Sequence, residues 1–125
     1  MLDTSTVYAT IPAKDLARAR AYYEEKLGLK PAEERPEGLR YECGGGHFLL
    51  FESSGEASGT HTQLGWDVED LDATVDQLRR NGVVFEEYDL PGFKTVNGIA
   101  DIAGERGAWF KDSEGNLMAV GERTA

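Results

Sequence analysis

An internal duplication is the feature that most constrains the fold of this chain. Residues 8–29 (YATIPAKDLARARAYYEEKLGL) and 63–84 (QLGWDVEDLDATVDQLRRNGVV) follow one plan, in which Asp15-Leu16 matches Asp70-Leu71 at an offset of 55 residues. In each copy a short run of alternating apolar residues precedes the aspartate. Aspartate suits a helix N-cap because its carboxylate accepts hydrogen bonds from the free amides of the first turn. The duplication therefore predicts two units, each opening with a strand and a helix.

Both expected helices show the spacing of an apolar stripe along one face. The stripe residues are Leu16, Ala19, Tyr23 and Leu27 in the first helix, and Leu71, Thr74 or Val75, and Leu78 in the second. Each helix is expected to stop at a glycine, Gly28 or Gly82, where the left-handed conformation costs little. The adjacent pair Tyr22-Tyr23 is therefore interpreted as packing and not as chemistry.

The strands that follow the helices predict a βαβββ unit, repeated twice. In the first half, LRYEC and HFLLFE flank the GGG turn, and in the second half VVFEEYDL, ADIAG, GAWFKD and NLMAVGE are the candidates. We expect one α+β domain over residues 1–125, with module one at about 5–53 and module two at about 60–122. Residues 89–107 are the least regular segment, which favours a binding loop or lid, with a plain surface loop as the alternative.

Composition limits the class of protein and of partner. The 125 residues are 40% hydrophobic and 29% charged, which suits a soluble globular domain. We find no signal peptide and no apolar run near the roughly 20 residues of a membrane span, and Cys43 is the only cysteine. A cytoplasmic protein is expected. The net charge of −10 disfavours nucleic acid and membrane partners and would attract cations, although it could serve solubility alone.

The segment WFKDSEGNLMAV, residues 109–120, predicts a hairpin whose turn is Asp112 to Asn116. Gly115 can supply the positive φ that such a turn requires. The strand after the turn, residues 117–120, carries no side chain that could bind a metal ion. This strand is either plain core or the wall of a site without metal-binding groups.

The paired modules and the F-x-D-x-x-G-N hairpin together resemble the vicinal oxygen chelate superfamily, from about Val7 to Val120. That superfamily includes glyoxalase I, extradiol dioxygenases and bleomycin-resistance binding proteins. The resemblance implies two βαβββ modules in a cupped mixed sheet, with helices outside and a ligand site inside the cup. In enzymes of the family, His, Glu or Gln residues on the first and last strand of each module hold a divalent metal there.

In this sequence, the resemblance places those four metal positions at Tyr8, Leu50, Gln63 and Ala119, with the register of Leu50 uncertain by one residue. Only Gln63 could coordinate a metal, and weakly, because a phenol has a pKa near 10 and the other two side chains are apolar. We therefore expect no metal and no cofactor. A shifted site of His61, Gln63 and Glu52 is conceivable by strand parity, although His61 fits better as a hydrogen-bonding residue at the rim.

An emptied metal site leaves a pocket wall that is aromatic, apolar and partly polar. The residues expected to line it, from strand parity and the family register, are Tyr8, Thr10, Phe48, Leu50, Gln63, Phe93, Trp109 and Ala119. Phe110 and Trp66 are expected to face helices. Such a pocket suits a planar or cationic small molecule, because aromatic rings bind both.

Two functions remain open from the sequence, besides a third interpretation as a subunit or scaffold without a ligand. The first is a metal-free binding protein that sequesters an aromatic or cationic compound, resembling the drug-binding members, which are usually homodimers with ligand between the subunits. The second is a glyoxalase-, isomerase- or dioxygenase-like enzyme with a non-standard metal site. The sequence names no ligand, and it leaves open whether the modules pair within one chain or swap between chains.

Overall fold

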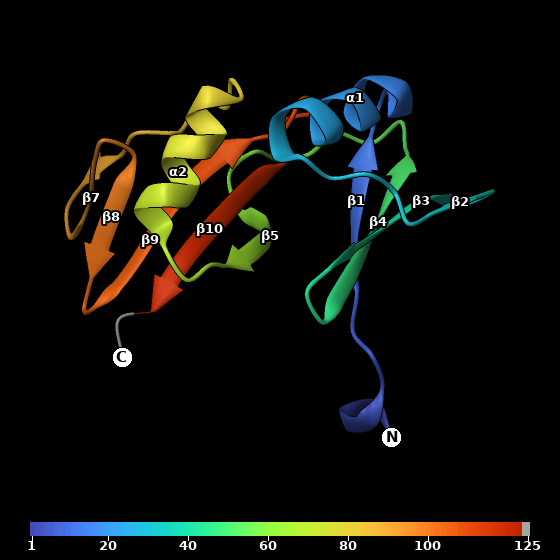
Figure 1. Ribbon diagram of the computed structural model, residues 1–125, viewed down its shortest axis with the longest axis horizontal. Coiled ribbons are helices and arrows are strands. Elements are labelled where there is room, and N and C mark those ends of the chain that lie inside the picture. Colours follow the sequence, from blue (N-terminus) through green and yellow to red (C-terminus); the bar gives the residue numbers. More distant parts are fainter. Residues whose placement is uncertain (124–125) are drawn as a thin grey trace.

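The first half of the chain has the predicted order of elements in the computed structural model, which describes residues 1–123. A short 3-10 helix, η1 (Leu2–Thr4), precedes it. Module one consists of β1 (Ala9–Ala13), α1 (Leu16–Leu27), β2 (Glu33–Arg35), β3 (Gly38–Cys43) and β4 (Gly46–Glu52). This order is βαβββ, as the duplication predicts. The η1 segment extends away from the body of the molecule (Figure 1).

Module two has five strands after its helix instead of three. Its elements are β5 (Thr62–Asp67), α2 (Leu71–Arg80), β6 (Asp89–Leu90), β7 (Phe93–Val96), β8 (Ile99–Ile102), β9 (Glu105–Lys111) and β10 (Leu117–Arg123). Residues 89–107 are not an irregular loop, because they form successive hairpins, in which the expected ADIAG strand is β8. Gly92, Gly98 and Gly104 adopt positive φ at the turns between these strands. The predicted strand 83–90 is reduced to β6 and one bridge between Phe85 and Phe110.

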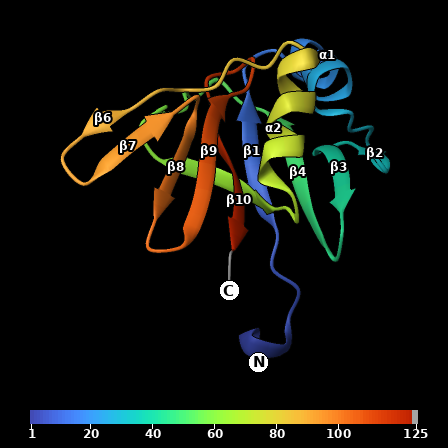
Figure 2. The ribbon, with the colours of Figure 1, turned by 60° about the vertical axis from the view of Figure 1, so that its left-hand side comes forward.

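The strands form two separate sheets, one in each module. Together with the two helices they confirm the expected α+β class. The first sheet has the order β1-β4-β3-β2 and the second β5-β10-β9-β8-β7-β6. β1 pairs with β4, and β5 with β10, in parallel, and the remaining pairs are antiparallel. β1 and β5 are edge strands that do not pair with each other. The β6–β7 hairpin forms the edge of the second sheet that lies far from module one (Figure 2).

Both helices begin and end close to the predicted positions. The carboxylates of Asp15 and Asp70 accept hydrogen bonds from the amides of Arg18 and Ala73, each at 3.0 Å. α1 ends at Gly28, which has a φ of 71°, and α2 ends at Arg80, two residues before Gly82. The buried members of the stripes are Ala19, Tyr23, Leu71 and Val75. Local capping and apolar spacing therefore suffice to place the helices.

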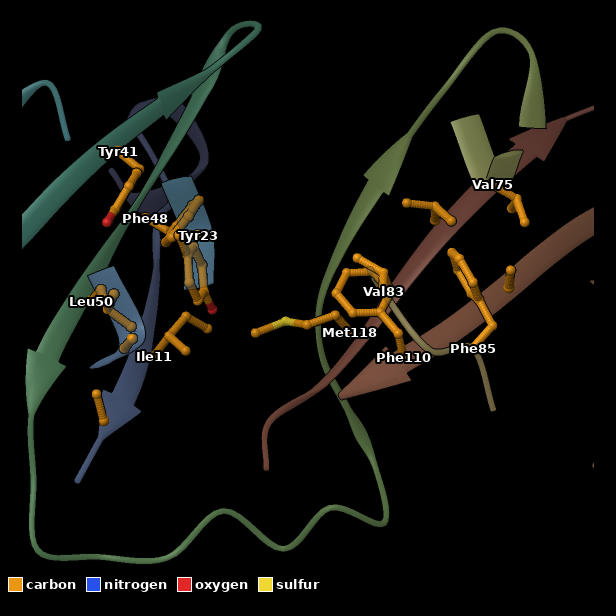
Figure 3. Close-up of a cluster of buried hydrophobic side chains, with 14 of the residues drawn as sticks. Ile11, Tyr23, Tyr41, Phe48, Leu50, Val75, Val83, Phe85, Phe110 and Met118 are labelled. Carbon is orange, nitrogen blue, oxygen red and sulfur yellow. The ribbon is translucent and has the colours of Figure 1, made fainter. Parts of the chain in front are cut away.

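One hydrophobic core lies between the helix-facing sides of both sheets. Tyr23 contacts Tyr41 and Phe48 in module one, with ring centroids 5.6 and 5.9 Å apart. Met118 of module two reaches across toward Ile11 and Tyr23, as Figure 3 shows. Since the two helix-facing sides share this core, the other face of each sheet turns away from it. We call these the outer faces.

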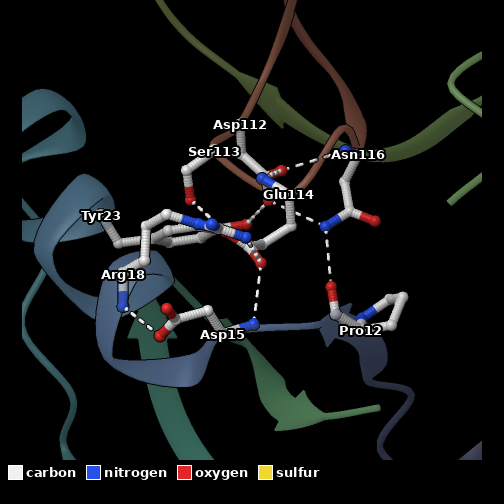
Figure 4. Close-up of polar contacts among 8 residues, drawn as sticks. All are labelled: Pro12, Asp15, Arg18, Tyr23, Asp112, Ser113, Glu114 and Asn116. Atoms are coloured by element: carbon white, nitrogen blue, oxygen red, sulfur yellow. Dashed lines mark hydrogen bonds and ion pairs between the residues drawn. The ribbon is translucent and has the colours of Figure 1, made fainter. Parts of the chain in front are cut away.

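The DSEGN turn between β9 and β10 ties module two to module one (Figure 4). The buried hydroxyl of Tyr23 donates to Asp112 Oδ2 at 2.8 Å, and Asn116 Nδ2 donates to the carbonyl of Pro12 at 2.9 Å. Arg18 donates from Nε and Nη2 to the two carboxylate oxygens of Glu114, at 2.8 and 2.9 Å. The turn that the sequence singles out is therefore a structural connection between the modules.

Glu114 is the charged centre of this connection. Its carboxylate also accepts hydrogen bonds from the Asp15 amide at 3.0 Å and from the Ser113 hydroxyl at 2.7 Å. The hydrogen bonds and charge of Arg18 favour the ionised form, and they lower the Glu114 pKa from 4.5 to about 2 against the opposing effect of burial. The link between the modules thus depends on an ionised carboxylate.

Candidate binding face

The strongest candidate site lies on the outer face of the second sheet, around Trp109. Ala108 and Phe110 are buried in the core, so the side chain of Trp109 between them emerges on the opposite face. This matches the prediction for Trp109 and Phe110. Ala119 lies beside Trp109 across β9 and β10, and Gly65 lies beside Ala119 across β10 and β5. Because Gly65 and Ala119 project little or nothing above the sheet, they form a flat floor next to the indole.

Three aromatic rings meet on this face. The ring centroid of Phe93 lies 5.1 Å from that of Trp109, and the centroid of Tyr88 lies 5.5 Å from Phe93 and 6.1 Å from Trp109. Their planes are inclined by 57° to 76°, the edge-to-face geometry that aromatic pairs prefer. The structure thus brings the predicted residues Phe93 and Trp109 together, and it adds Tyr88. In a strand that begins with the buried Phe85, Tyr88 falls on the opposite face. The sequence could therefore have placed Tyr88 beside Phe93 if the hairpin that carries Phe93 had been recognised.

Backbone pairing and a glycine hold the three rings in place. The amide of Tyr88 donates to Thr95 Oγ1 at 2.8 Å, and the amide of Thr95 donates to the Tyr88 carbonyl at 2.9 Å. The indole of Trp109 lies over Gly107, where an added Cβ would be only 3.2 Å from its Cη2 atom. The rings are therefore fixed by β7 and β9 and need little ordering to receive a ligand.

One carboxylate and one ammonium group lie beside this face, in a protein whose net charge is −10. Burial and the nearby charge of Glu86 both raise the pKa of Tyr88, which is therefore neutral at physiological pH. Glu86 forms an ion pair with Lys111, in which Oε1 and Nζ are 3.7 Å apart. A cation beside these rings gains from their π-electron faces and from the net charge of −10, whereas an anion gains from neither.

A second group of predicted residues lies on the outer face of the first sheet. The ring of Tyr8 stacks on that of His47, with centroids 5.0 Å apart and planes inclined by 17°. Thr10, two residues after Tyr8, is beside Leu49 in the parallel pair of β1 and β4. A small hollow of about 150 Å³ adjoins this stack and is lined by Tyr8, Arg35, Glu37, Arg40, His47 and Leu49.

The prediction that Phe48 and Leu50 line the site is wrong. Both are buried in the core on the helix-facing side, at 2% and 0% exposure. Only Gly44 and Gly45 form the turn, since Gly46 already pairs with Cys43 in β4. A shift of one residue turns every side chain of a strand to the other face. His47 and Leu49 therefore take the places expected for Phe48 and Leu50.

The remaining predicted residues divide between the two sheets. Gln63 and Ala119 belong to the second sheet with Phe93 and Trp109, while Tyr8 and Thr10 belong to the region of the first. Because the outer faces turn away from the shared core, one chain does not bring the two groups together. The predicted cup is present as two separate halves.

The shifted metal site gains no support from the geometry. His61 Nδ1 lies 2.6 Å from the hydroxyl of Ser58, which matches the rim role, and Glu52 ends a strand of the other sheet. Within residues 1–123, no group of three or more His, Cys, Asp or Glu side chains could hold a metal ion. The described side chains therefore offer no set of strong ligands for catalytic metal chemistry.

Sequence comparison now identifies the fold family. The profile of the Glyoxalase/Bleomycin resistance protein/Dioxygenase superfamily matches residues 5–120. The chain belongs to this superfamily. The resemblance noted from the repeat and the hairpin is thereby confirmed. Membership fixes the fold and leaves the activity to be argued from the site.

Several solved structures share the fold at low sequence identity. UcmS2 is 22% identical with a TM-score of 0.73, over 94% of this chain and 97% of UcmS2. A glyoxalase/bleomycin resistance protein/dioxygenase from Alicyclobacillus acidocaldarius is 20% identical with a TM-score of 0.71, over 98% and 93% of the two chains. TnmS3, an antibiotic-binding protein from Streptomyces sp. CB03234, is 20% identical with a TM-score of 0.66, over 98% of each chain.

No curated protein sequence matched the chain. No helix among the described residues is long and apolar enough to cross a membrane.

Proposed function

We propose that this protein is a metal-free binding protein for a planar aromatic compound, preferentially a cationic one. The observation that carries the proposal is the cluster of Tyr88, Phe93 and Trp109 beside the flat floor of Gly65 and Ala119. A planar ligand can lie on this floor and contact the edge or face of the indole. Each aromatic stacking contact contributes about 1 kcal/mol beyond the apolar area that it buries.

The positions that hold a metal in enzymes of the superfamily support binding without chemistry. Of the four positions, Leu50 and Ala119 cannot coordinate a metal, Tyr8 carries a phenol, which is a poor ligand, and Gln63 offers one neutral oxygen. The fold is shared with TnmS3, an antibiotic-binding protein. Sequestration of a drug-like aromatic compound is therefore the role that fits this face best.

We further infer that a second copy of the chain completes the site. One chain carries the two halves of the cup on faces that point apart, and the edge strands β1 and β5 have free hydrogen-bonding edges. Val7 and Tyr8, next to β1, are 84% and 54% exposed. Pairing β1 of one copy with β5 of the other would cover these side chains. It would also bring the Tyr8–His47 stack toward the Trp109 cluster in a closed two-fold dimer.

Binding can be tested with proflavine, a planar aromatic cation, using its fluorescence and the thermal unfolding of the protein. We expect Trp109→Ala to weaken proflavine binding at least tenfold, since about 1.4 kcal/mol corresponds to a factor of ten. Trp66→Phe is the matched control, because Trp66 packs on the core side. Equal affinities of the two variants, or no binding by the folded wild-type protein, would refute the site.

Metal dependence and assembly need separate measurements. We expect elemental analysis of unchelated protein to find no stoichiometric metal, and proflavine affinity to stay unchanged after dialysis against EDTA. Sedimentation equilibrium should give a dimer that Val7→Glu weakens by placing a charge on the exposed apolar segment. A stoichiometric transition metal would overturn the metal-free proposal, and a monomer that binds proflavine with wild-type affinity would overturn the dimeric site.

A further inference from the structure

Glu86 places a carboxylate beside the aromatic cluster of the outer face. Phe85 and Phe110 form an antiparallel bridge, so Glu86 lies opposite Trp109 and shares its face of the sheet. The amide of Glu86 donates to the carbonyl of Trp109 at 2.7 Å, which fixes this neighbourhood. Ala119 pairs with Trp109 from the other side of β9. The indole therefore has the flat floor on one side and a carboxylate on the other.

The carboxylate of Glu86 is poorly satisfied for its degree of burial. Its side chain is 31% exposed, and within residues 1–123 its only partner is the Lys111 ammonium. The 3.7 Å between Lys111 Nζ and Glu86 Oε1 exceeds the usual hydrogen-bond length of about 2.7–3.2 Å. The adjacent Glu87, by contrast, accepts hydrogen bonds from the Thr95 hydroxyl and the Gly98 amide. Glu86 thus keeps acceptor capacity that the described part of the protein does not use.

The ring faces beside this carboxylate also hold no cation of the protein itself. Among residues 1–123 the one cation–π contact joins Arg79 to the buried Phe85. The ammonium of Lys111 lies instead against the segment between the modules, where a Cβ added to Gly59 would be 3.5 Å from its Nζ. The Lys111 side chain is 47% exposed, so it can turn into water. A ligand cation can therefore take the place of Lys111 beside Glu86 and contact the aromatic rings as well.

We propose that Glu86 selects the charge of the ligand, by accepting hydrogen bonds from a protonated amine or amidine at the edge of its aromatic ring, and that this group displaces Lys111. The assignment rests on the proposed function of the outer face and names its ligand class more narrowly. Hydrogen bonds between an N–H cation and a carboxylate are stronger than neutral ones, so a cation without N–H groups gains less here. Opposite residues of an antiparallel pair have Cβ atoms about 5 Å apart, so the amine must be close to the ring.

Three planar probes of similar size separate charge from hydrogen bonding. At pH 8 proflavine is a cation with N–H donors, 10-methylacridinium is a cation without them, and acridine is neutral. We expect Glu86→Gln to weaken proflavine binding at least fivefold and 10-methylacridinium binding about twofold, and to leave acridine binding unchanged. Glu105→Gln is the matched control, because it removes the same charge from the same face of β9, about 13 Å away along the strand.

Removal of the competing ammonium tests the displacement. Lys111→Met should raise the affinity for proflavine at least threefold, because the ligand then replaces no cation at Glu86, and should leave the affinity for acridine unchanged. Lys94→Met is the control, since it removes the same charge from β7 on the helix-facing side of the sheet, where Lys94 lines a hollow beside α2. Thermal unfolding checks that every variant is folded.

The possible results separate this assignment from the proposed function. Equal proflavine affinities of Glu86→Gln and Glu105→Gln, with acridine binding still weakened by Trp109→Ala, would overturn the role of Glu86 and leave the aromatic site standing. Equal proflavine affinities of Lys111→Met and Lys94→Met would overturn the displacement of Lys111. Failure of all three probes to bind the folded wild-type protein would overturn the proposed function and this assignment together.

Discussion

Neutralising Glu114 should weaken the connection between the modules, and the effect should disappear in acid. The lowering of the Glu114 pKa from 4.5 to about 2 corresponds to about 3 kcal/mol, at about 1.4 kcal/mol per pH unit. The side chain of Arg18 is 55% exposed, so water screens the pair and reduces its net contribution. We therefore expect Glu114→Gln to lower the free energy of unfolding at pH 7 by about 1–2 kcal/mol.

The direction in which stability changes with pH follows because the pKa of Glu114 is lower in the folded protein than in the unfolded chain. The unfolded chain takes up a proton at Glu114 near pH 4.5, whereas the folded protein does so only near pH 2. The stabilisation is therefore complete above about pH 5 and is lost as the pH falls toward 2. Glu114→Gln lacks this carboxylate, so its unfolding free energy should approach that of the wild type as the pH falls.

Urea unfolding of both proteins between pH 7 and pH 2.5 measures this convergence. The difference between the two curves isolates Glu114, because every other carboxylate titrates in both proteins. Glu56→Gln is the control, since Glu56 forms an ion pair with Lys14 on the surface and should change stability much less. A difference between wild type and Glu114→Gln that stays constant across this pH range would refute the reasoning.

Two further substitutions test how the modules are built. Tyr23→Phe should lower the free energy of unfolding by about 1–2 kcal/mol, since it removes a buried hydrogen bond to Asp112, and urea unfolding at pH 7 measures the loss. Gly38→Ala should cost at least about 2 kcal/mol, because its φ of 148° disfavours a side chain and the new Cβ would clash with the Leu50 carbonyl. Gly45→Ala, whose Cβ would meet nothing within 4 Å, should change stability by less than about 0.5 kcal/mol.

Sequence reasoning succeeded where the signal is local and periodic. The N-caps Asp15 and Asp70, the stop at Gly28 and the apolar stripes each depend on residues within a few positions of one another. Sequence reasoning failed to predict which face of β4 carries Phe48 and Leu50. The GGG segment permits more than one turn, and a shift of one residue exchanges the two faces of the strand. Sequence reasoning also failed at residues 89–107, where hairpins with short strands carry a weak pattern.

The sequence by itself determined the duplicated plan, the two capped helices and the absence of strong metal ligands at the family positions. Only the tertiary structure decided which residues share a surface, since Tyr88, Phe93 and Trp109 come from three segments that are joined by strand pairing. It also decided that the outer faces point apart and that DSEGN joins the modules. Strand parity gives two possible faces, and only packing of the core, through residues far apart in the sequence, selects between them.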